Sequence, residues 1–294
     1  MMSKSPAQTP NLTGRILHAM ARSSFARQAY TVCRHIPVLG PLAHASVDRL
    51  LPHGTRAWAR LPDGLGKGLW FNSDPRFELG YCNGDHEPWV QELLQKHLRQ
   101  GDCFYDIGGH TGFFSLIAAR FVGEKGSVVA VEADPENAQL LRVNASRNHM
   151  AQINVLEAAA WSSCGWLCFE RAGAASNRTE GHVVDSGNGQ GGTIRVSAVS
   201  LDHLVSSEGL RAPQLLKIDV EGAEWEVLQG TTGMLRAARP RVLCEVHDPQ
   251  MIEEIRSFLA DLGYLTEHWQ PRHPRYADYK QHYVWGVPNA VSGE

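Results

Sequence analysis

The segment from which we predict the architecture of this 294-residue chain reads Phe104-Tyr-Asp-Ile-Gly-Gly-His-Thr-Gly-Phe-Phe-Ser-Leu116. It passes from apolar and aromatic residues through an acid and a glycine cluster into an apolar run with helical spacing. This order predicts a strand, a tight turn and the start of a helix. An open α/β sheet holds its ligand at such a junction.

The glycines of this turn have the spacing Asp-x-Gly-x-x-x-Gly, formed by Asp106, Gly108 and Gly112, and not the dinucleotide spacing Gly-x-Gly-x-x-Gly. A pyrophosphate beside a helix N-terminus needs bare backbone N–H groups, and a carboxylate at the strand end would repel it. S-adenosylmethionine carries an ammonium and a sulfonium, which that carboxylate would attract. The turn therefore predicts a methyl donor site, although glycines at a junction can also serve close packing alone.

Strands and helices alternate on both sides of this turn, which predicts an α/β fold with a doubly wound, mostly parallel sheet. We expect the last strand to be antiparallel. The predicted strands are 103–107, 127–132, 153–157, 214–219, 240–246, 264–267 and 283–287, and the predicted helices are 87–100, 112–121, 135–147, 201–205, 223–229 and 250–262. Further short strands are predicted at 166–170 and 193–196, with a long loop over residues 171–192 between them.

The N-terminal part of the chain differs in charge from the rest, because several basic residues precede the first acid, Asp48. Residues 13–36 have a composition that suits a helix with a solvated basic face. The same residues could instead bind an anionic membrane surface weakly, or act as an organelle transit peptide. Residues 57–61 and 68–71 read as a short β-hairpin. We therefore predict an N-terminal extension over residues 1–80 and a main domain over residues 81–294.

Composition narrows the classes of partner. The formal net charge is −3, which supplies no field that would gather nucleic acid. Six cysteines lie without a Cys-x-x-Cys pair, which argues against a zinc site or a disulfide framework. No apolar run approaches the roughly 18 residues needed to span a bilayer, and no signal-peptide pattern opens the chain. We expect a soluble, cytoplasmic protein.

Two further features would complete a cofactor pocket. Glu132 ends the second predicted strand, where an acid can accept both ribose hydroxyls of an adenosine ligand. Small residues centred on Ala159 follow the third predicted strand, where the face of an adenine could lie. Small residues also allow close packing, so this second assignment has a structural alternative.

Polar residues gather at the ends of two later strands. The segment Leu216-Lys-Ile-Asp-Val-Glu-Gly-Ala-Glu224 places Asp219 and Glu221 at a second strand-to-helix turn. Glu245 and His247 lie on one side of the next strand, because side chains alternate along a strand. His247 is the first candidate for a general base, with Asp219 and Glu221 as alternatives. A divalent ion such as Mg²⁺, held by Asp219 and Glu245, would be another way to activate a hydroxyl.

At these segments the sequence resembles the FkbM-type methyltransferase family. The matching motifs are Tyr105-Asp-Ile-Gly-Gly-His-Thr-Gly-Phe-Phe, Val131-Glu-Ala-Asp-Pro-Glu-Asn137, Lys217-Ile-Asp-Val-Glu-Gly-Ala-Glu224 and Glu245-Val-His247. The resemblance extends over roughly residues 80–290. It implies the class I, Rossmann-like S-adenosylmethionine fold and, most often, O-methylation of hydroxyls on sugars or secondary metabolites.

By this resemblance, Asp106, Gly108, Gly112 and Glu132 would hold the cofactor. One departure is visible, because the family usually has Gly-Ala-Asn after the strand where this chain has Gly108-Gly109-His110. A neutral histidine can donate and accept a hydrogen bond as an asparagine does. We therefore expect His110 to preserve cofactor binding with greater sensitivity to pH.

The activity that these features favour is S-adenosylmethionine-dependent O-methylation of a small-molecule, sugar or lipid-linked acceptor. A nicotinamide-dependent oxidoreductase on a related fold is the alternative enzyme, disfavoured by Asp106 and by the missing Gly-x-Gly. A non-catalytic protein that binds S-adenosylmethionine is the third reading. We expect the N-terminal segment and the loop over 171–192 to set the acceptor.

Overall fold

The computed structural model describes residues 56–74, 79–171, 181–184, 193–272 and 281–290. The chain forms two compact units, Met1–Pro88 and Trp89–Glu294. The helix predicted over residues 13–36 lies outside the described residues, as does most of the loop predicted over 171–192. No helix within the described ranges is both long enough and apolar enough to cross a membrane.

The first unit contains the predicted hairpin, which is confirmed. Strands β1 (Ala57–Arg60) and β2 (Trp70–Ser73) pair antiparallel. Phe71 is buried and packs edge to face on Tyr81, with ring centroids 5.8 Å apart. Tyr81 lies in α4 (Leu79–Asn83), a one-turn helix that the sequence analysis did not predict.

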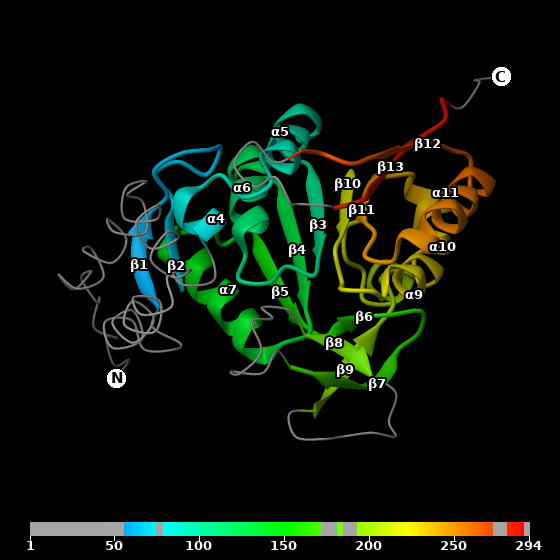
Figure 1. Ribbon diagram of the computed structural model, residues 1–294, viewed down its shortest axis with the longest axis horizontal. Coiled ribbons are helices and arrows are strands. Elements are labelled where there is room, and N and C mark those ends of the chain that lie inside the picture. Colours follow the sequence, from blue (N-terminus) through cyan, green and yellow to red (C-terminus); the bar gives the residue numbers. More distant parts are fainter. Residues whose placement is uncertain (1–55, 75–78, 172–180, 185–192, 273–280, 291–294) are drawn as a thin grey trace, which may run out of the picture. The chain divides into compact units, whose positions relative to one another are not determined.

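The second unit contains a seven-stranded sheet in the order β12-β13-β11-β10-β3-β4-β5 (Figure 1). Its strands are β3 (Cys103–Ile107), β4 (Ser127–Glu132), β5 (Ile153–Glu157), β10 (Leu215–Ile218), β11 (Arg241–Glu245), β12 (Tyr264–Trp269) and β13 (Tyr283–Pro288). All neighbouring pairs are parallel except those of β13, which runs antiparallel to β11 and β12. The predicted doubly wound sheet with an antiparallel last strand is therefore confirmed.

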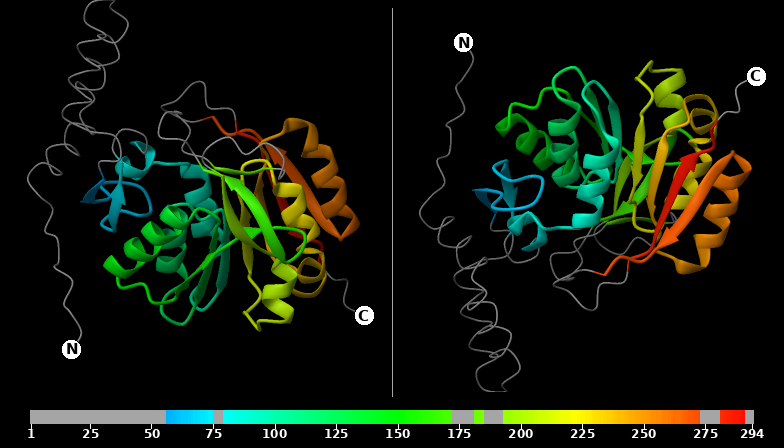
Figure 2. Two further views of the ribbon diagram at one scale, coloured as in Figure 1. Left: turned by 90° about the horizontal axis from the view of Figure 1, so that it is seen from below. Right: turned by 90° about the horizontal axis from the view of Figure 1, so that it is seen from above.

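Helices cover both faces of this sheet. Figure 2 shows α6 and α7 on one face and α9 to α11 on the other. The helices are α5 (Pro88–His97), α6 (Phe113–Val122), α7 (Pro135–Arg147), α8 (Leu201–Ser206), α9 (Glu224–Gln229), α10 (Thr232–Ala238) and α11 (Ile252–Asp261), with the 3-10 turn η1 (Pro249–Met251) before α11. All five residues of β3 are buried, as a central strand covered on two faces requires.

A second sheet is inserted between β5 and β10 in the chain. It has the order β6-β9-β7-β8, formed by β6 (Ala159–Ala160), β7 (Gly165–Glu170), β8 (His182–Val184) and β9 (Thr193–Val199). The prediction of one loop over 171–192 is wrong at β8, which pairs antiparallel with β7. Three residues are too few to display an alternating pattern, so only the pairing with β7 reveals this strand.

The sequence analysis also missed α10, for a reason that lies in tertiary structure. The carboxylate of Asp202, at the start of α8, accepts hydrogen bonds from the backbone N–H groups of Gly233 (2.9 Å) and Met234 (2.7 Å). This caps the first turn of α10 with a side chain from another helix. Thr231 stands at the N-cap position, but its hydroxyl donates to the carbonyl of Val227 and does not cap the helix.

We predict that Asp202→Ala lowers the free energy of unfolding by about 1–2 kcal/mol, because two N–H groups of α10 lose their acceptor. Urea denaturation of the purified protein measures this change. Glu124→Ala, which removes an exposed carboxylate from the turn after α6, serves as the control and should leave the midpoint almost unchanged. Equal midpoints for the two variants would contradict the capping role of Asp202.

Candidate functional site

The turn after β3 and the turn after β10 touch through their backbones. Gly108 has φ +79°, and a Cβ atom there would overlap the carbonyl oxygen of Asp219. The backbone N–H of Asp219 donates to the carbonyl of Ile107 at 3.0 Å. The two polar clusters predicted from the sequence therefore meet at one edge of the sheet, where the parallel strands end.

Gly112 has a different role from Gly108. Its φ is +93°, and a Cβ atom there would lie 2.7 Å from Cγ of Leu141 in α7. The absence of a side chain lets the start of α6 pack closely against α7. The close packing that the sequence analysis gave as an alternative is therefore present at Gly112, and its predicted contact with the cofactor stays a prediction.

Asp106 is a buried carboxylate, and one of its oxygens has no hydrogen-bond partner among the described residues. Ser115 Oγ donates to Oδ2 at 2.5 Å, and Lys217 Nζ lies 3.7 Å from Oδ1. Oδ1 is buried and accepts no hydrogen bond from the described residues. Burial raises the pKa of Asp106, while the charge of Lys217 and the bond from Ser115 lower it. A cationic donor such as the ammonium of S-adenosylmethionine fits the unmet need of Oδ1.

Glu132 binds two backbone segments at once. Its Oε2 accepts from the N–H of His110 at 2.7 Å, and its Oε1 accepts from the N–H of Asp134 at 2.9 Å. Burial raises the pKa of Glu132 to about 7, against the effect of these two hydrogen bonds. His110 has φ +46°, which lies in the left-handed region. In this conformation its N–H points toward Glu132. The residue that departs from the family pattern thus contacts the predicted ribose carboxylate through its main chain.

Ala159 lies in β6 and not at the open edge of the seven-stranded sheet. It is 5% exposed and packs with Phe169 and Val196 in the core of the second sheet. The preceding residue, Ala158, donates its N–H to the carbonyl of Glu132 at 3.0 Å. The structure therefore places Ala159 next to the Glu132 segment but in a packing environment.

The second cluster is organised around the ring of His247. Nδ1 lies 2.7 Å from Glu224 Oε1, and Nε2 lies 3.1 Å from Glu221 Oε2. Nε2 also lies 3.8 Å from Asp219 Oδ1 and 3.8 Å from Glu245 Oε1. Four carboxylates thus surround one imidazole, and all the acceptor-side residues predicted from the sequence are brought together.

The charge of this cluster favours a protonated histidine. Burial lowers the pKa of His247, but hydrogen bonds with Glu221 and Glu224 and the charge of Asp219 raise it to about 12. An imidazolium donates from both nitrogens and has no lone pair left to accept a proton. In this arrangement His247 holds the carboxylates together as their counter-ion.

Two of the acids around His247, Asp219 and Glu245, also accept hydrogen bonds from residues outside the cluster. Lys217 Nζ donates to Asp219 Oδ2 at 2.8 Å, and the hydroxyl of Tyr283 donates to Glu245 Oε2 at 3.0 Å. One ligand atom each from Asp219, Glu245 and His247 lies within 4.8 Å of the others, a spacing that could accommodate a metal ion. Outer hydrogen bonds of this kind orient the ligands of metal sites.

Sequence reasoning missed or undervalued three of these contacts. Ser115 stands on the first helical turns of α6, and no motif predicts its bond to Asp106. Tyr283 comes from the last strand and reaches Glu245 only through the β11–β13 pairing. Glu224 lies in the first turn of α9, where an acid is favourable for the helix alone, yet it binds His247. Only the spacing of Glu224 within the Lys-x-Asp-Val-Glu-Gly-Ala-Glu segment could have indicated its role.

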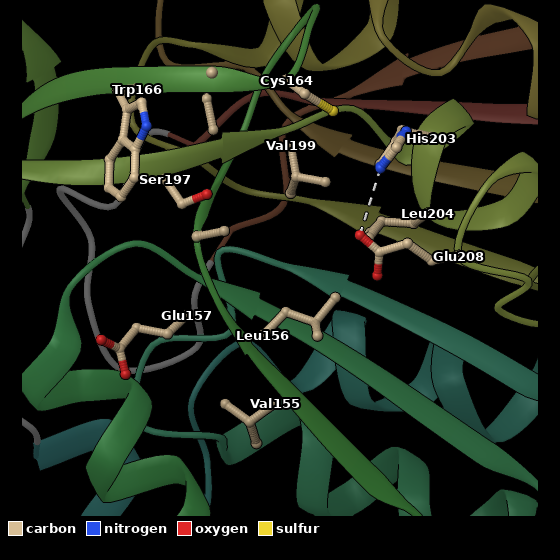
Figure 3. Close-up of a pocket in the computed structure, with 13 residues that line it drawn as sticks. Val155, Leu156, Glu157, Cys164, Trp166, Ser197, Val199, His203, Leu204 and Glu208 are labelled. Atoms are coloured by element: carbon tan, nitrogen blue, oxygen red, sulfur yellow. Dashed lines mark ion pairs between the residues drawn. The ribbon is translucent and has the colours of Figure 1, made fainter.

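A pocket of about 630 Å³ lies apart from these two clusters, beside the edge strand β5 (Figure 3). Its lining comes from β5, β7, β9 and α8, and it includes none of the predicted site residues. Trp166 is 63% exposed there, with the guanidinium of Arg195 4.7 Å from its ring centroid. The two polar clusters described above therefore do not line this pocket.

Comparison with known proteins identifies related chains. A family model described as the methyltransferase FkbM domain matches residues 106–266, a range that contains both polar clusters. The hexuronic acid methyltransferase AglP of Haloferax volcanii is 31% identical over 178 residues, which are 60% of this chain and 70% of that protein. The solved methyltransferase FkbM of Methylobacillus flagellatus is 15% identical with a TM-score of 0.46, covering 72% of this chain and 54% of that one.

We predict that Gly108→Ala destabilises the protein by about 2–4 kcal/mol, because strain at positive φ adds to the overlap with Asp219. Gly101→Ala is the matched control, since Gly101 has φ +88° but open space around the added Cβ. It should cost only about 1–2 kcal/mol. Thermal unfolding compares the two variants, and equal losses would show that the close approach of the two turns contributes nothing.

Proposed function

The chain belongs to the methyltransferase FkbM domain family and is an S-adenosylmethionine-dependent methyltransferase, and on this premise we propose that it methylates a hydroxyl oxygen. The observation that carries the proposal is the group of carboxylates around His247, beside the cofactor turn. An alcohol is a poor nucleophile until its proton leaves, so O-methylation needs such acceptors close to the methyl donor.

The acceptor class that we propose is a sugar, a glycan or glycolipid, or a hydroxylated secondary metabolite. The relative AglP, 31% identical, is named for action on a hexuronic acid, which supports a sugar acceptor. A weak contact with a membrane surface through the basic N-terminal segment, outside the described residues, stays a prediction.

S-adenosylmethionine supplies the methyl group on a positively charged sulfur. Asp106 Oδ1 would accept from its ammonium, and Glu132 would accept from its ribose hydroxyls. Gly108 and His110 shape the turn that brings these two acids to one edge. The protein then has to hold the acceptor oxygen in line and to exclude water, since alignment and desolvation provide much of the rate.

We assign the removal of the acceptor proton to Asp219 or Glu221. Both are partly exposed, whereas Glu224 and Glu245 are buried. His247, the first candidate from the sequence, carries a proton in this arrangement, so we assign it the positioning of these carboxylates. Glu221 has φ +55°, a strained conformation for a residue with a side chain, which is common at functional sites.

A divalent ion is the second way in which the cluster could act. Asp219 and Glu245 offer hard oxygen atoms that suit Mg²⁺, and His247 Nε2 offers a third ligand. The outer bonds from Lys217 and Tyr283 fit such a site. An ion there would lower the pKa of a bound hydroxyl and would take the place of the proton on His247.

Asp106→Asn should weaken S-adenosylmethionine binding roughly 10- to 100-fold, because an amide cannot pair with the ammonium as a carboxylate does. Isothermal titration calorimetry measures the change. Asp102→Asn is the control, as Asp102 lies just before β3 and its carboxylate accepts a backbone N–H from Arg99. Unchanged affinity in the Asp106 variant would remove this residue from the cofactor site.

Transfer of a labelled methyl group to hexuronic acids, other sugars and hydroxylated extracts tests the proposed activity directly. We expect Glu221→Gln to lower kcat about 10²- to 10⁴-fold while the KM for S-adenosylmethionine stays close to that of the wild type. Activity that survives a chelator would assign the chemistry to a carboxylate base, and activity restored by Mg²⁺ would assign it to the ion. Binding of the cofactor without turnover on any acceptor would favour a non-catalytic protein.

A further inference from the structure

Arg171 links the second sheet to the start of α7. It follows β7, and its Nε and Nη2 lie 2.8 and 3.1 Å from the two carboxylate oxygens of Asp134. Nη2 also lies 2.7 Å from Glu136 Oε2. This two-pronged contact joins residues 37 positions apart in sequence, which fits the planar fork of a guanidinium.

Asp134 has two other roles besides its contact with Arg171. Its side chain caps α7 by accepting the N–H of Glu136 at 2.8 Å. Its own backbone N–H donates to Glu132 Oε1 at 2.9 Å. Any shift of Asp134 therefore moves one of the two donors that orient the Glu132 carboxylate.

Arg171 also offsets the negative charge of Asp134 and Glu136, which lie close to Glu132 in the chain. Asp134 and Glu136 lie two and four residues away, and the charge of Asp134 raises the pKa of Glu132. The groups that oppose this rise are the N–H groups of His110 and Asp134 and the side chain of Asn137. On the neighbouring strand, Glu157 is paired with Arg142 at 3.0 Å. Arg171 pairs with both Asp134 and Glu136 at the start of α7.

We propose that Arg171 is a positioning residue for cofactor binding, which acts by holding Asp134 and so keeps the Glu132 carboxylate oriented toward the ribose hydroxyls. The inference rests on the cofactor role proposed for Glu132. The pair of Arg171 and Asp134 is largely buried, so its loss would also lower stability, and a stability measurement alone would not separate this role from a structural one. The second sheet thereby contributes a residue to cofactor affinity although none of its strands ends at the cofactor turn.

Titration calorimetry of Arg171→Gln with S-adenosylmethionine tests the proposal. We expect binding at about pH 7 to be roughly 5- to 30-fold weaker than in the wild type. The loss should shrink at about pH 8.5, because Glu132 without its balancing cation needs a higher pH to ionise. At saturating cofactor kcat should equal that of the wild type, so the defect would appear in KM for S-adenosylmethionine.

Two further variants make the result decisive. Arg171→Lys keeps the charge without the fork and should recover part of the affinity, and it carries the test if Arg171→Gln does not fold. Arg256→Gln is the control, because Arg256 is similarly exposed and pairs with Glu253 on α11. An affinity that matches the wild type at both pH values would overturn the proposal. A loss of affinity in Arg171→Gln that is the same at both pH values, and that Arg171→Lys does not reduce, would also overturn the proposal.

The proposed function fails in a different way. Wild-type protein without measurable S-adenosylmethionine binding would remove the cofactor assignment on which the inference rests. Wild-type binding that is normal, together with an Arg171 variant that binds equally well, would overturn only the role of Arg171.

Discussion

The backbone contact between Gly108 and Asp219 is the constraint on which the rest of the site depends. It requires a glycine after β3, because any side chain would overlap the neighbouring carbonyl. It also places the acids that we propose for the cofactor and those that we propose for the acceptor at one edge of one sheet. Lys217 also connects the two turns, since its ammonium lies between Asp106 and Asp219 and pairs with both carboxylates. The two groups of acids, around Asp106 and around His247, are therefore linked electrostatically through Lys217.

This arrangement of charges explains why so many acids can gather without partners of equal number. Lys217 and a protonated His247 are cations at the centre of the acids, and Asp219, Glu224 and Glu245 also accept hydrogen bonds from Lys217, the N–H of Gly222 and Tyr283, in that order. Removing one member of such a network leaves a charge without its partner. The strained backbone at Glu221 and His110 shows that both turns hold conformations which only their surroundings stabilise.

The sequence predicted the parts of the fold that local pattern controls. Strands β3, β4 and β5 and helix α7 match their predicted ranges, because their apolar spacing and their bounding residues agree. What pattern could not show depends on distant partners. Helix α10 needs Asp202 as its cap, β8 needs β7 as its pairing strand, and Glu224 needs His247 to become more than a first-turn acid. Among the site residues, proximity in space was predictable for Asp219, Glu245 and His247, but their charge state was not.

The insertion of the second sheet between β5 and β10 affects how the protein folds during its synthesis on the ribosome. Strand β3 cannot pair with β10 until β10 has been synthesised. The N–H of Cys103, for example, donates to the side chain of Gln214, which lies 111 positions later in the chain. At roughly 5–20 residues per second, about 5–20 s pass while one edge of β3 stays open. An apolar central strand with a free edge readily pairs with other chains. The second sheet therefore lengthens the interval in which the nascent chain needs protection from aggregation.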